Sequence, residues 1–217
     1  MPTLIPSQPV PLERGPDDVI RVKGSRVTLD TIVAAFAEGA TAEEIAQQSG
    51  QEVVIVNPVI VMGPGDLNMI SGSFLKEVKR FGRMTTVTPG GVSVTDVRDV
   101  ARWHLAAAER GRPGERYLLG TANYSSREWL HMVAEVVGVA RPRLHIPGVI
   151  LPTMARLIDF VRSLGIKTPV DSNQARLGAH SIHFDFTKAW TELGRPQVDM
   201  RQSVYDTYTW YVENGYM

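Results

Sequence analysis

Two histidines close in sequence are the first residues of the chain that could do chemistry. His180 and His183 are separated by two residues, a spacing that invites a zinc hypothesis. Two imidazoles are too few for zinc, which takes three or four protein ligands, and the chain has no cysteine to complete a set. Residues 182–186 also alternate like a strand, in which successive side chains point to opposite faces. We therefore predict no metal site here.

A second candidate group combines acidic and basic side chains. Asp96 and Asp99 stand at the start of a helix predicted over residues 97–110, where the helix dipole favours carboxylates. This position indicates helix capping rather than acid–base catalysis. Arg98 and Arg102 are one helical turn apart and could bind a phosphate, although a solvated surface is the simpler interpretation.

Residues 52–66, EVVIVNPVIVMGPGD, join a strand to a turn. Residues 53–56 form a β-branched run, which is typical of a strand covered on both faces. Asn57 and Pro58 follow it. Proline fixes φ, so we expect it to lead the chain out of the sheet at the carboxyl end, where ligands bind in α/β folds. Residues 63–66 predict a loop.

The remaining elements indicate an α/β fold with a parallel sheet. The helix over 97–110 runs directly into a strand over 116–119, and strand, crossover, helix and strand is the signature of parallel pairing. Ser125 and Glu128 form a capping-box pattern that opens a helix ending at Gly138. Residues 84–87 and 92–95 are predicted to be extended on either side of a Pro-Gly-Gly turn. We also predict a strand over 144–146 and helices over 152–164, 188–193 and 201–214.

Composition excludes several classes of function. The 217 residues carry 23 basic and 23 acidic side chains, so no overall field attracts nucleic acid or acidic lipid. The chain has no cysteine, no apolar run of membrane length and no basic-then-apolar leader. These features predict a cytoplasmic protein without disulfides.

The first fifty residues have a different character. After a proline-rich start, residues 19–22 predict a short strand, and a helix over 30–38, Gly39 and a second helix from Thr41 predict a helix-turn-helix-like unit. Residues 6–48 resemble the opening of small antitoxin-like winged-helix domains. Segment 1–50 holds 4 basic and 7 acidic residues, an unfavourable balance for phosphate contact. A packing or protein-contact unit is therefore favoured over DNA binding.

From about residue 51 onward the chain resembles the C-terminal half of extended short-chain dehydrogenases/reductases, the group of dihydroflavonol reductase-like enzymes and epimerases. Five phrases carry the resemblance in family order. They are NPVIVMGPGD at 57–66, VSVTDVRDVARWHLAAAERGRPGERYLLG at 92–120, YSSREWLHMVAEVVG at 124–138, HFDFTKAWTELGRP at 183–196 and DTYTWYVENGY at 206–216. The resemblance implies two domains, 1–50 and 51–217, the second being a partial Rossmann-type sheet with the substrate lobe.

The resemblance also implies a cofactor, NAD or NADP. In the family the first of these segments lies beside the nicotinamide, which assigns Asn57, Pro58, Val59 and Ile60 as cofactor-binding residues. The family also needs a glycine-rich turn for the pyrophosphate and a Tyr-x-x-x-Lys pair for proton transfer. No tyrosine of this chain is followed by lysine four residues later, and no glycine-rich dinucleotide turn is present. This speaks against cofactor binding by this chain alone and assigns no catalytic residue.

Three hypotheses follow from these observations. The first is a protein of NAD(P)-dependent reductase or epimerase lineage, catalytically incomplete as a single chain. The second is a non-catalytic interaction or toxin–antitoxin-like regulatory protein, in which a second copy or a partner chain covers a free sheet edge. The third, a DNA-binding regulator, requires the glycine-linked helix pair to enter a groove.

Overall fold

The computed structural model describes residues 12–14, 20–22, 44, 53–163, 165, 178 and 180–217. These residues fall into two compact units. The smaller unit includes β1 (Leu12–Arg14), β2 (Ile20–Val22), residues 53–55 and residues 112–115. The larger unit covers residues 56–111 and 116–217. The predicted boundary between residues 50 and 51 stays a prediction, and the predicted helix pair around Gly39 lies outside the described residues.

The smaller unit contains an antiparallel strand pair. Leu12 pairs with Val22 and Arg14 with Ile20. The strand predicted over 19–22 is therefore present at Ile20–Val22. Its partner, β1, falls within the proline-rich start.

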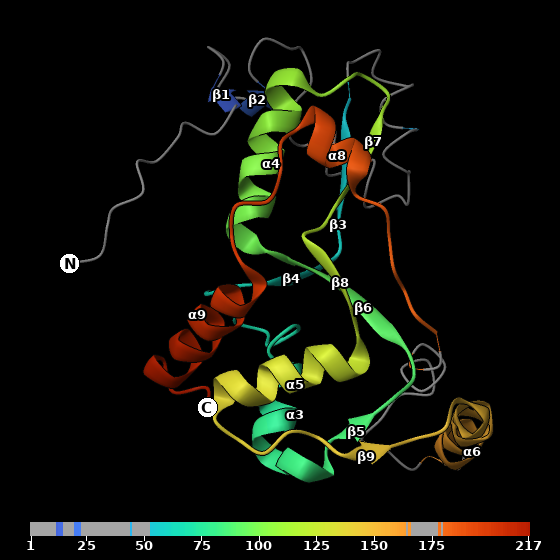
Figure 1. Ribbon diagram of the computed structural model, residues 1–217. Helices are drawn as coiled ribbons and strands as arrows, with labels where there is room; N and C mark the ends of the chain where they lie inside the picture. Colours follow the sequence, from blue (N-terminus) through green and yellow to red (C-terminus); the bar gives the residue numbers. More distant parts are fainter. Residues whose placement is uncertain are drawn as a thin grey trace. The chain divides into compact units, whose positions relative to one another are not determined.

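Parallel pairing forms the centre of the larger unit. β3 (Ile55–Pro58) pairs with β7 (Arg116–Leu119), and Val59 N donates to Leu119 O at 3.0 Å. β4 (Ile60–Met62) pairs in parallel with β6 (Gly91–Asp96), which pairs on its other side with antiparallel β8 (Ala122–Ser125). The predicted α/β fold with parallel strands is confirmed (Figure 1).

The helices α4, α5 and α9 begin after capping side chains. α4 (Val97–Arg110) starts after Asp96, whose carboxylate accepts from Arg98 N, and α5 (Ser126–Val137) starts at the predicted Ser125–Glu128 capping box. α9 (Met200–Glu213) starts after Asp199, which accepts from two backbone N–H groups. α5 ends at Gly138 in a left-handed conformation with φ of 78°, as predicted.

The larger unit contains further helices and strands among the described residues. They are α3 (Ser73–Phe81), η1 (Gly82–Met84), β5 (Thr86–Val87), β9 (Leu144–His145), η2 (Gly148–Ile150), α6 (Leu151–Ser163) and α8 (Thr187–Glu192). We expected the extended segments before and after residues 89–91 to flank a simple turn. They do not pair with each other, because β5 pairs with β9 in parallel while β6 pairs with β4 and β8.

The hydrophobic core lies where α5 packs against α3, α9 and the β4–β6–β8 sheet (Figure 1). Trp129 of α5 is its largest side chain, and Phe74 meets it edge-on with ring centroids 6.1 Å apart. Burying side chains of this kind contributes about 1.5–3 kcal/mol each. The fully or nearly fully buried members are Met62, Leu75, Val78, Val87, Val94, Trp129, Leu130, Val133, Ala134, Met200 and Val204.

The strand predicted over residues 182–186 is wrong. Only Ser181 makes an isolated bridge, to Gly91. The polar groups of Phe184 are instead bound by one side chain, since Asn123 Nδ2 donates to Phe184 O at 2.9 Å and Asn123 Oδ1 accepts from Phe184 N at 3.3 Å. An asparagine thus replaces the strand ladder that the alternating pattern indicated.

Candidate functional site

The candidate site begins where the chain passes from β3 to β4. Val59 separates the two strands, and the chain passes there from the β3–β7 sheet to the β4–β6–β8 sheet, in which it continues to Met62. Pro58 is exposed and is the last residue of β3, so the chain leaves the β3–β7 sheet at this proline, as predicted. It leaves the second sheet at Gly63.

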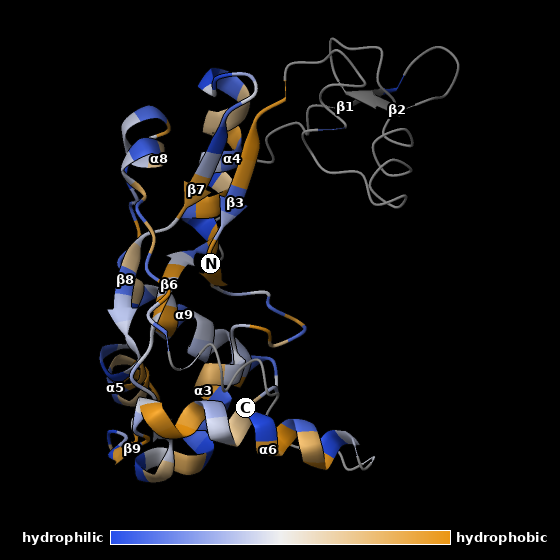
Figure 2. Cartoon of the chain, turned by 90° about the vertical axis from the view of Figure 1, so that its right-hand side faces the viewer, coloured by the Kyte–Doolittle hydropathy of each residue, from blue (hydrophilic) through white to orange (hydrophobic). Residues whose placement is uncertain are grey.

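Proline is tolerated at this position because of the direction of its backbone nitrogen. The N–H of Val59 faces β7, and so does that of Ile55, which donates to Glu115 O at 2.9 Å. The backbone nitrogens of Val56 and Pro58, at the even positions, therefore point to the opposite edge of β3. A residue without an N–H removes no ladder hydrogen bond there. Among the described residues β3 has no second strand partner, and Figure 2 shows it beside β7, hydrophobic in its first part and hydrophilic further along.

Asn57 stands out among the predicted cofactor-binding residues. Its side-chain oxygen Oδ1 is buried and has no hydrogen-bond partner among the described residues. A buried acceptor without a donor costs about 1–3 kcal/mol, so an unpaired group of this kind in a folded protein calls for a missing partner. Val59 and Ile60 are half-buried and offer only backbone groups and apolar side chains.

The carboxyl ends of β4 and β6 lie together. Met62 is in register with Asp96, and the residues that follow them, Gly63 and Val97, are in close contact. A Cβ atom on Gly63 would lie 2.3 Å from Val97 Cγ1, and the φ of Gly63 is 151°. Glycine is therefore required for α4 to begin beside this turn.

Asp96 is a capping residue, as the sequence predicts. It is fully buried, and its carboxylate accepts from Arg98 N at 2.7 Å, Nε at 2.9 Å and Nη2 at 2.9 Å. Burial works against ionisation, but the hydrogen bonds from Arg98 outweigh it and hold the pKa of Asp96 below its ordinary value. Arg98 also pairs with Asp206 of α9 at 2.8 Å.

Asp99 has a role that the sequence does not reveal. Its buried carboxylate accepts from Gln197 N at 2.9 Å and Val198 N at 3.1 Å, and it also pairs with Arg102. Asp99 thereby fixes the segment before α9 to α4. Neither arginine that we considered for a phosphate is free, because Arg98 and Arg102 are each bound to carboxylates.

A carboxylate clamp closes the loop of residues 63–72 that follows β4. Asp66 accepts from Ser71 N at 2.9 Å, from Ile70 N and Gly72 N at 3.2 Å each, and from the hydroxyl of Tyr211 at 2.9 Å. Partial burial raises the pKa of Asp66, but these hydrogen bonds dominate and leave it below the ordinary value. Burial and the bond to Asp66 raise the pKa of Tyr211, which is fully buried.

The clamp explains a glycine. A Cβ atom on Gly72 would lie 2.3 Å from the Tyr211 oxygen, so only glycine lets the tyrosine of α9 reach Asp66. Tyr205, Tyr208 and Tyr211 recur at every third residue of α9. In the structure Tyr205 is 53% exposed and Tyr211 is fully buried, so they do not share one environment.

The histidines do not converge on a metal centre. His183 Nε2 lies 3.2 Å from Tyr124 O, and both His180 and His183 are exposed. Within the described ranges no cluster of three or more His, Cys, Asp or Glu side chains could hold a metal ion. His104 is exposed, and its Nδ1 lies 2.8 Å from Val100 O.

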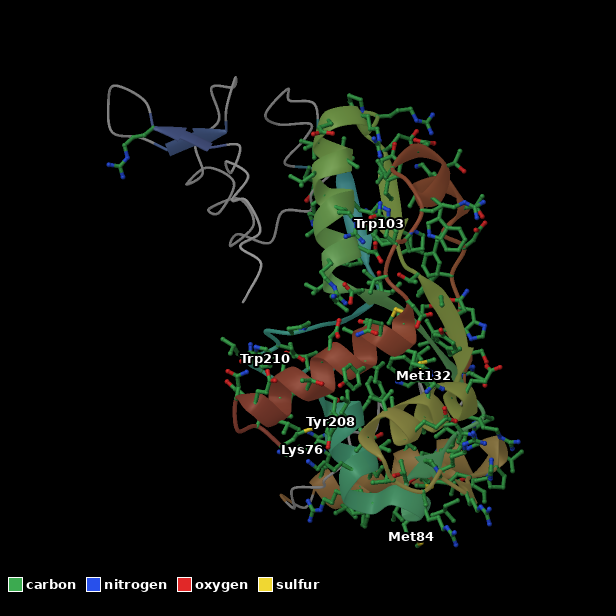
Figure 3. All side chains as sticks on the ribbon, turned by 60° about the vertical axis from the view of Figure 1, so that its left-hand side comes forward. Lys76, Met84, Trp103, Met132, Tyr208 and Trp210 are labelled. Carbon is green, nitrogen blue, oxygen red and sulfur yellow. The ribbon has the colours of Figure 1, made fainter. Side chains whose placement is uncertain are left out.

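Trp103 of α4, labelled in Figure 3, is nearly fully buried. Its indole N–H donates to Gly194 O at 2.7 Å. Together with the Asp99 contacts, it fixes the segment between α8 and α9 against α4.

No described helix is long and apolar enough to cross a membrane.

Comparison with known proteins identifies relatives for much of the chain. No family model matches it. It is 33% identical over 178 residues to a candidate dihydroflavonol 4-reductase of Synechocystis, and 31% identical over 176 residues to sterol demethylase protein B of Methylococcus capsulatus. These matches cover 79% and 76% of this chain and 52% of each relative, so the chain spans about half the length of the curated relatives it matches.

Solved structures give a similar result. A nucleoside-diphosphate-sugar epimerase from Pseudomonas aeruginosa superposes with a TM-score of 0.67 at 25% identity, over 95% of this chain and 65% of that one. A UDP-glucose 4-epimerase from Thermotoga maritima shares the fold, with a TM-score of 0.56 at 17% identity over 91% of this chain and 56% of that one. Part of this chain thus shares sequence and fold with reductases and epimerases of the short-chain dehydrogenase/reductase family. The reductase resemblance is confirmed at this level, and the antitoxin-like segment stays a prediction.

Proposed function

We propose that this chain forms the substrate side of an NAD(P)-dependent reductase or epimerase of the short-chain dehydrogenase/reductase family. In such a protein hydride moves between the nicotinamide and a carbonyl or hydroxyl carbon. The observation that carries the proposal is the buried Oδ1 of Asn57 on β3, which has no hydrogen-bond partner in the described part of the chain. The relatives and structural neighbours support the lineage.

The residues present fit the nicotinamide end of the cofactor. A carboxamide N–H donates a hydrogen bond, and Asn57 Oδ1 is an acceptor that lacks a donor. Pro58 has a backbone carbonyl but no N–H at the open edge of β3. Its backbone therefore offers no hydrogen-bond donor there that could compete with the cofactor for an acceptor. When bound, the nicotinamide would supply the hydride, and Asn57 would orient the ring.

These 217 residues do not provide the rest of the chemistry. They contain no G-x-G-x-x-G sequence and no Tyr-x-x-x-Lys pair. The nearest glycine pair, Gly111 and Gly114, lies between α4 and β7 rather than between a strand and a following helix. We therefore infer that the pyrophosphate cradle and the proton donor come from residues outside these 217, in the same or another polypeptide.

The open edge of β3 is the docking surface that we propose for this complementary part. In the described residues β3 is paired on one side only, and its apolar residues are half-buried. An extended partner strand would satisfy the backbone groups of Val56 and cover this edge, as in other cases of strand addition. The same partner would hold the cofactor, whose carboxamide N–H would then lie within reach of Asn57 Oδ1.

Complementation tests the proposal. The part of the Synechocystis relative that lies outside the matched region is expressed separately and mixed with this chain, and NADPH fluorescence is titrated. We expect enhancement in the mixture, none with this chain alone, and weaker binding with Asn57→Ala. Asn68→Ala is the matched control, because Asn68 is an exposed asparagine in the 63–72 loop. If the mixture enhances NADPH fluorescence no more than its separate parts do, the proposal is wrong. If this chain alone binds NADPH, the inference that its cofactor site is incomplete is wrong.

The alternative function is a non-catalytic interaction or toxin–antitoxin-like regulatory protein. It uses the same open edge of β3 as a contact surface for a second copy or another protein. It predicts a stable assembly by size-exclusion chromatography in which the nicotinamide titration stays flat.

A further inference from the structure

One end of the larger unit combines basic side chains with exposed apolar ones. It consists of α3 and η1, residues 73–84, and of residues 139–163, which contain β9, η2 and α6. We call these two stretches the basic end. Together they contain 8 basic and 2 acidic residues, whereas the whole chain contains 23 of each. The balanced total charge therefore conceals a strongly positive region.

The two stretches of the basic end lie side by side. β5, which follows η1, pairs in parallel with β9, and Arg143 N donates to Arg83 O at 3.2 Å. η2 approaches the turn after β5, since a Cβ atom on Gly148 would lie 3.1 Å from Pro89 Cγ. Figures 1 and 2 show β9 and α6 at the end of the larger unit opposite β7 and α8, and Figure 3 places Met84 at the same end.

Large apolar side chains are exposed on each part of this end. Single exposed apolar residues are ordinary, but a group of them on adjoining elements marks an interaction surface. Val149 of η2 is the most exposed, at 84%. The group consists of Phe81, Met84, Leu144, Val149, Ile150, Leu157 and Phe160.

Helix α6 exposes an apolar face. Seven of its 13 residues are apolar, but only Leu151 and Ala155 are buried. These two are four residues apart and share one side of the helix. Leu157 and Phe160, which are 62% and 60% exposed, are three residues apart and share the opposite side. Since the outer face of a surface helix in water normally carries polar side chains, this face requires an apolar partner.

Several cations around the apolar surface are available to an anion. The side chains of Arg83, Arg143 and Arg156 are exposed, and within the described part of the chain no carboxylate pairs with them. Arg141 differs, because it is bound to Glu135 at 2.6 Å. The partner of this surface must therefore supply negative charge as well as apolar contact.

From these observations we propose that the basic end binds reversibly to the surface of an anionic lipid bilayer. The apolar side chains of η2 and α6 enter the boundary between headgroups and acyl chains, and α6 lies in the plane of the membrane surface. The arginines contact lipid phosphates while their aliphatic stems stay in apolar surroundings. This is binding to the surface, because no described helix could cross the bilayer.

Charge and position favour a membrane over a protein chain as the partner. Two basic ends that face each other would bring like charges together, which disfavours a contact between two copies. The complementary part proposed above docks at the open edge of β3. That strand pairs with β7, at the other end of the larger unit (Figure 1), so the basic end stays uncovered.

Sedimentation with vesicles tests the proposal. The full chain is mixed with vesicles of phosphatidylcholine alone or of phosphatidylcholine with about 30% phosphatidylglycerol, an anionic lipid. We expect binding to the anionic vesicles to be about tenfold tighter or more. It should weaken when NaCl rises from about 0.1 M to about 0.5 M, because salt screens exposed charges.

Two double variants separate the apolar and the charged contributions. Leu157→Ala/Phe160→Ala should bind anionic vesicles about tenfold more weakly, because fewer apolar atoms leave water. Arg83→Gln/Arg143→Gln should bind about thirtyfold more weakly, which corresponds to about 2 kcal/mol for two charges near an anionic surface.

The matched apolar control is Leu105→Ala/Val212→Ala. Both side chains are exposed, on α4 and α9, outside the basic end. This variant should bind like wild type. Circular dichroism verifies that all variants are folded.

Other results overturn the proposal. Absence of binding, equal binding to both kinds of vesicle, or equal affinity of the apolar variant and its control shows that the basic end is not a membrane-binding surface. If vesicles are not bound and size-exclusion chromatography shows a dimer that Leu157→Ala/Phe160→Ala dissociates, a second copy covers the surface. If the complementary part of the Synechocystis relative abolishes vesicle binding, that part covers it instead.

Discussion

The hydrogen bond between Tyr211 and Asp66 offers a quantitative test of the structure. Tyr211→Phe removes the hydroxyl and leaves the buried ring, which packs against Trp210 and Tyr216 at centroid distances of 5.5 Å and 5.8 Å. The expected cost is therefore that of one hydrogen bond to a charged group, about 1.5–3 kcal/mol. Since three backbone N–H groups still hold Asp66 in the variant, we expect about 2 kcal/mol, in the middle of this range.

Urea denaturation at pH 7 measures this difference. The slope of the unfolding free energy against urea should not change, because the variant exposes the same surface on unfolding. Tyr205→Phe in the same helix is the control. Tyr205 is 53% exposed, so its loss should stay within about 0.5 kcal/mol.

The pH dependence gives a second, independent check. The pKa of Asp66 is lowered in the folded protein, so its contribution to stability is present above the unfolded pKa of about 4 and is lost as pH falls through the folded pKa. The difference between wild type and Tyr211→Phe should therefore be full at pH 7 and shrink under acid conditions. A variant as stable as wild type at pH 7, or a difference that does not change with pH, would refute the role assigned to the clamp.

Two further substitutions test the other carboxylate and capping contacts. Asp99→Ala leaves the N–H groups of Gln197 and Val198 without their acceptor. Since each unpaired group costs about 1–3 kcal/mol, we expect a loss of stability of about 3 kcal/mol and a fall in Tm of about 6–12 °C. An unchanged Tm in calorimetry would rule the contact out. Ser125→Ala breaks the capping box with Glu128 and should cost about 1 kcal/mol in urea denaturation. A variant as stable as wild type would show that the cap contributes nothing, and an equal loss in a Glu128→Ala background would show that the two side chains act independently.

Local signals in the sequence were sufficient to predict most helices. α4 matches its predicted range, 97–110, and α5 begins at the predicted capping box and ends at the predicted glycine. Capping, helix propensity and apolar periodicity act over a few residues, so they can be read without knowledge of the fold. The predicted cofactor-binding residues Asn57, Pro58, Val59 and Ile60 stay a prediction, to which the structure adds the unpaired oxygen of Asn57.

Contacts between distant residues could not be predicted in this way. The strand expected over 182–186 failed because Asn123, some sixty positions earlier, binds the backbone of Phe184. The sequence also does not reveal which edge of β3 is paired, and this decides whether proline is tolerated at position 58. The residues around Asp66, between Gly63 and Gly72, give no indication that its carboxylate binds the hydroxyl of Tyr211, 145 positions away in the chain.

The sequence by itself determined the α/β class, the main helices and their caps, and the absence of a dinucleotide turn and a Tyr-x-x-x-Lys pair, since each depends on residues that are neighbours in the chain. Only the tertiary structure decided what the charged residues do. Asp66, Asp96 and Asp99 are bound by donors from the 63–72 loop, α4, α9 and the segment before α9. Folding brings these donors together because burying the apolar faces of the helices fixes their positions, and a carboxylate buried with them must then find its partners among whatever groups the packing places nearby.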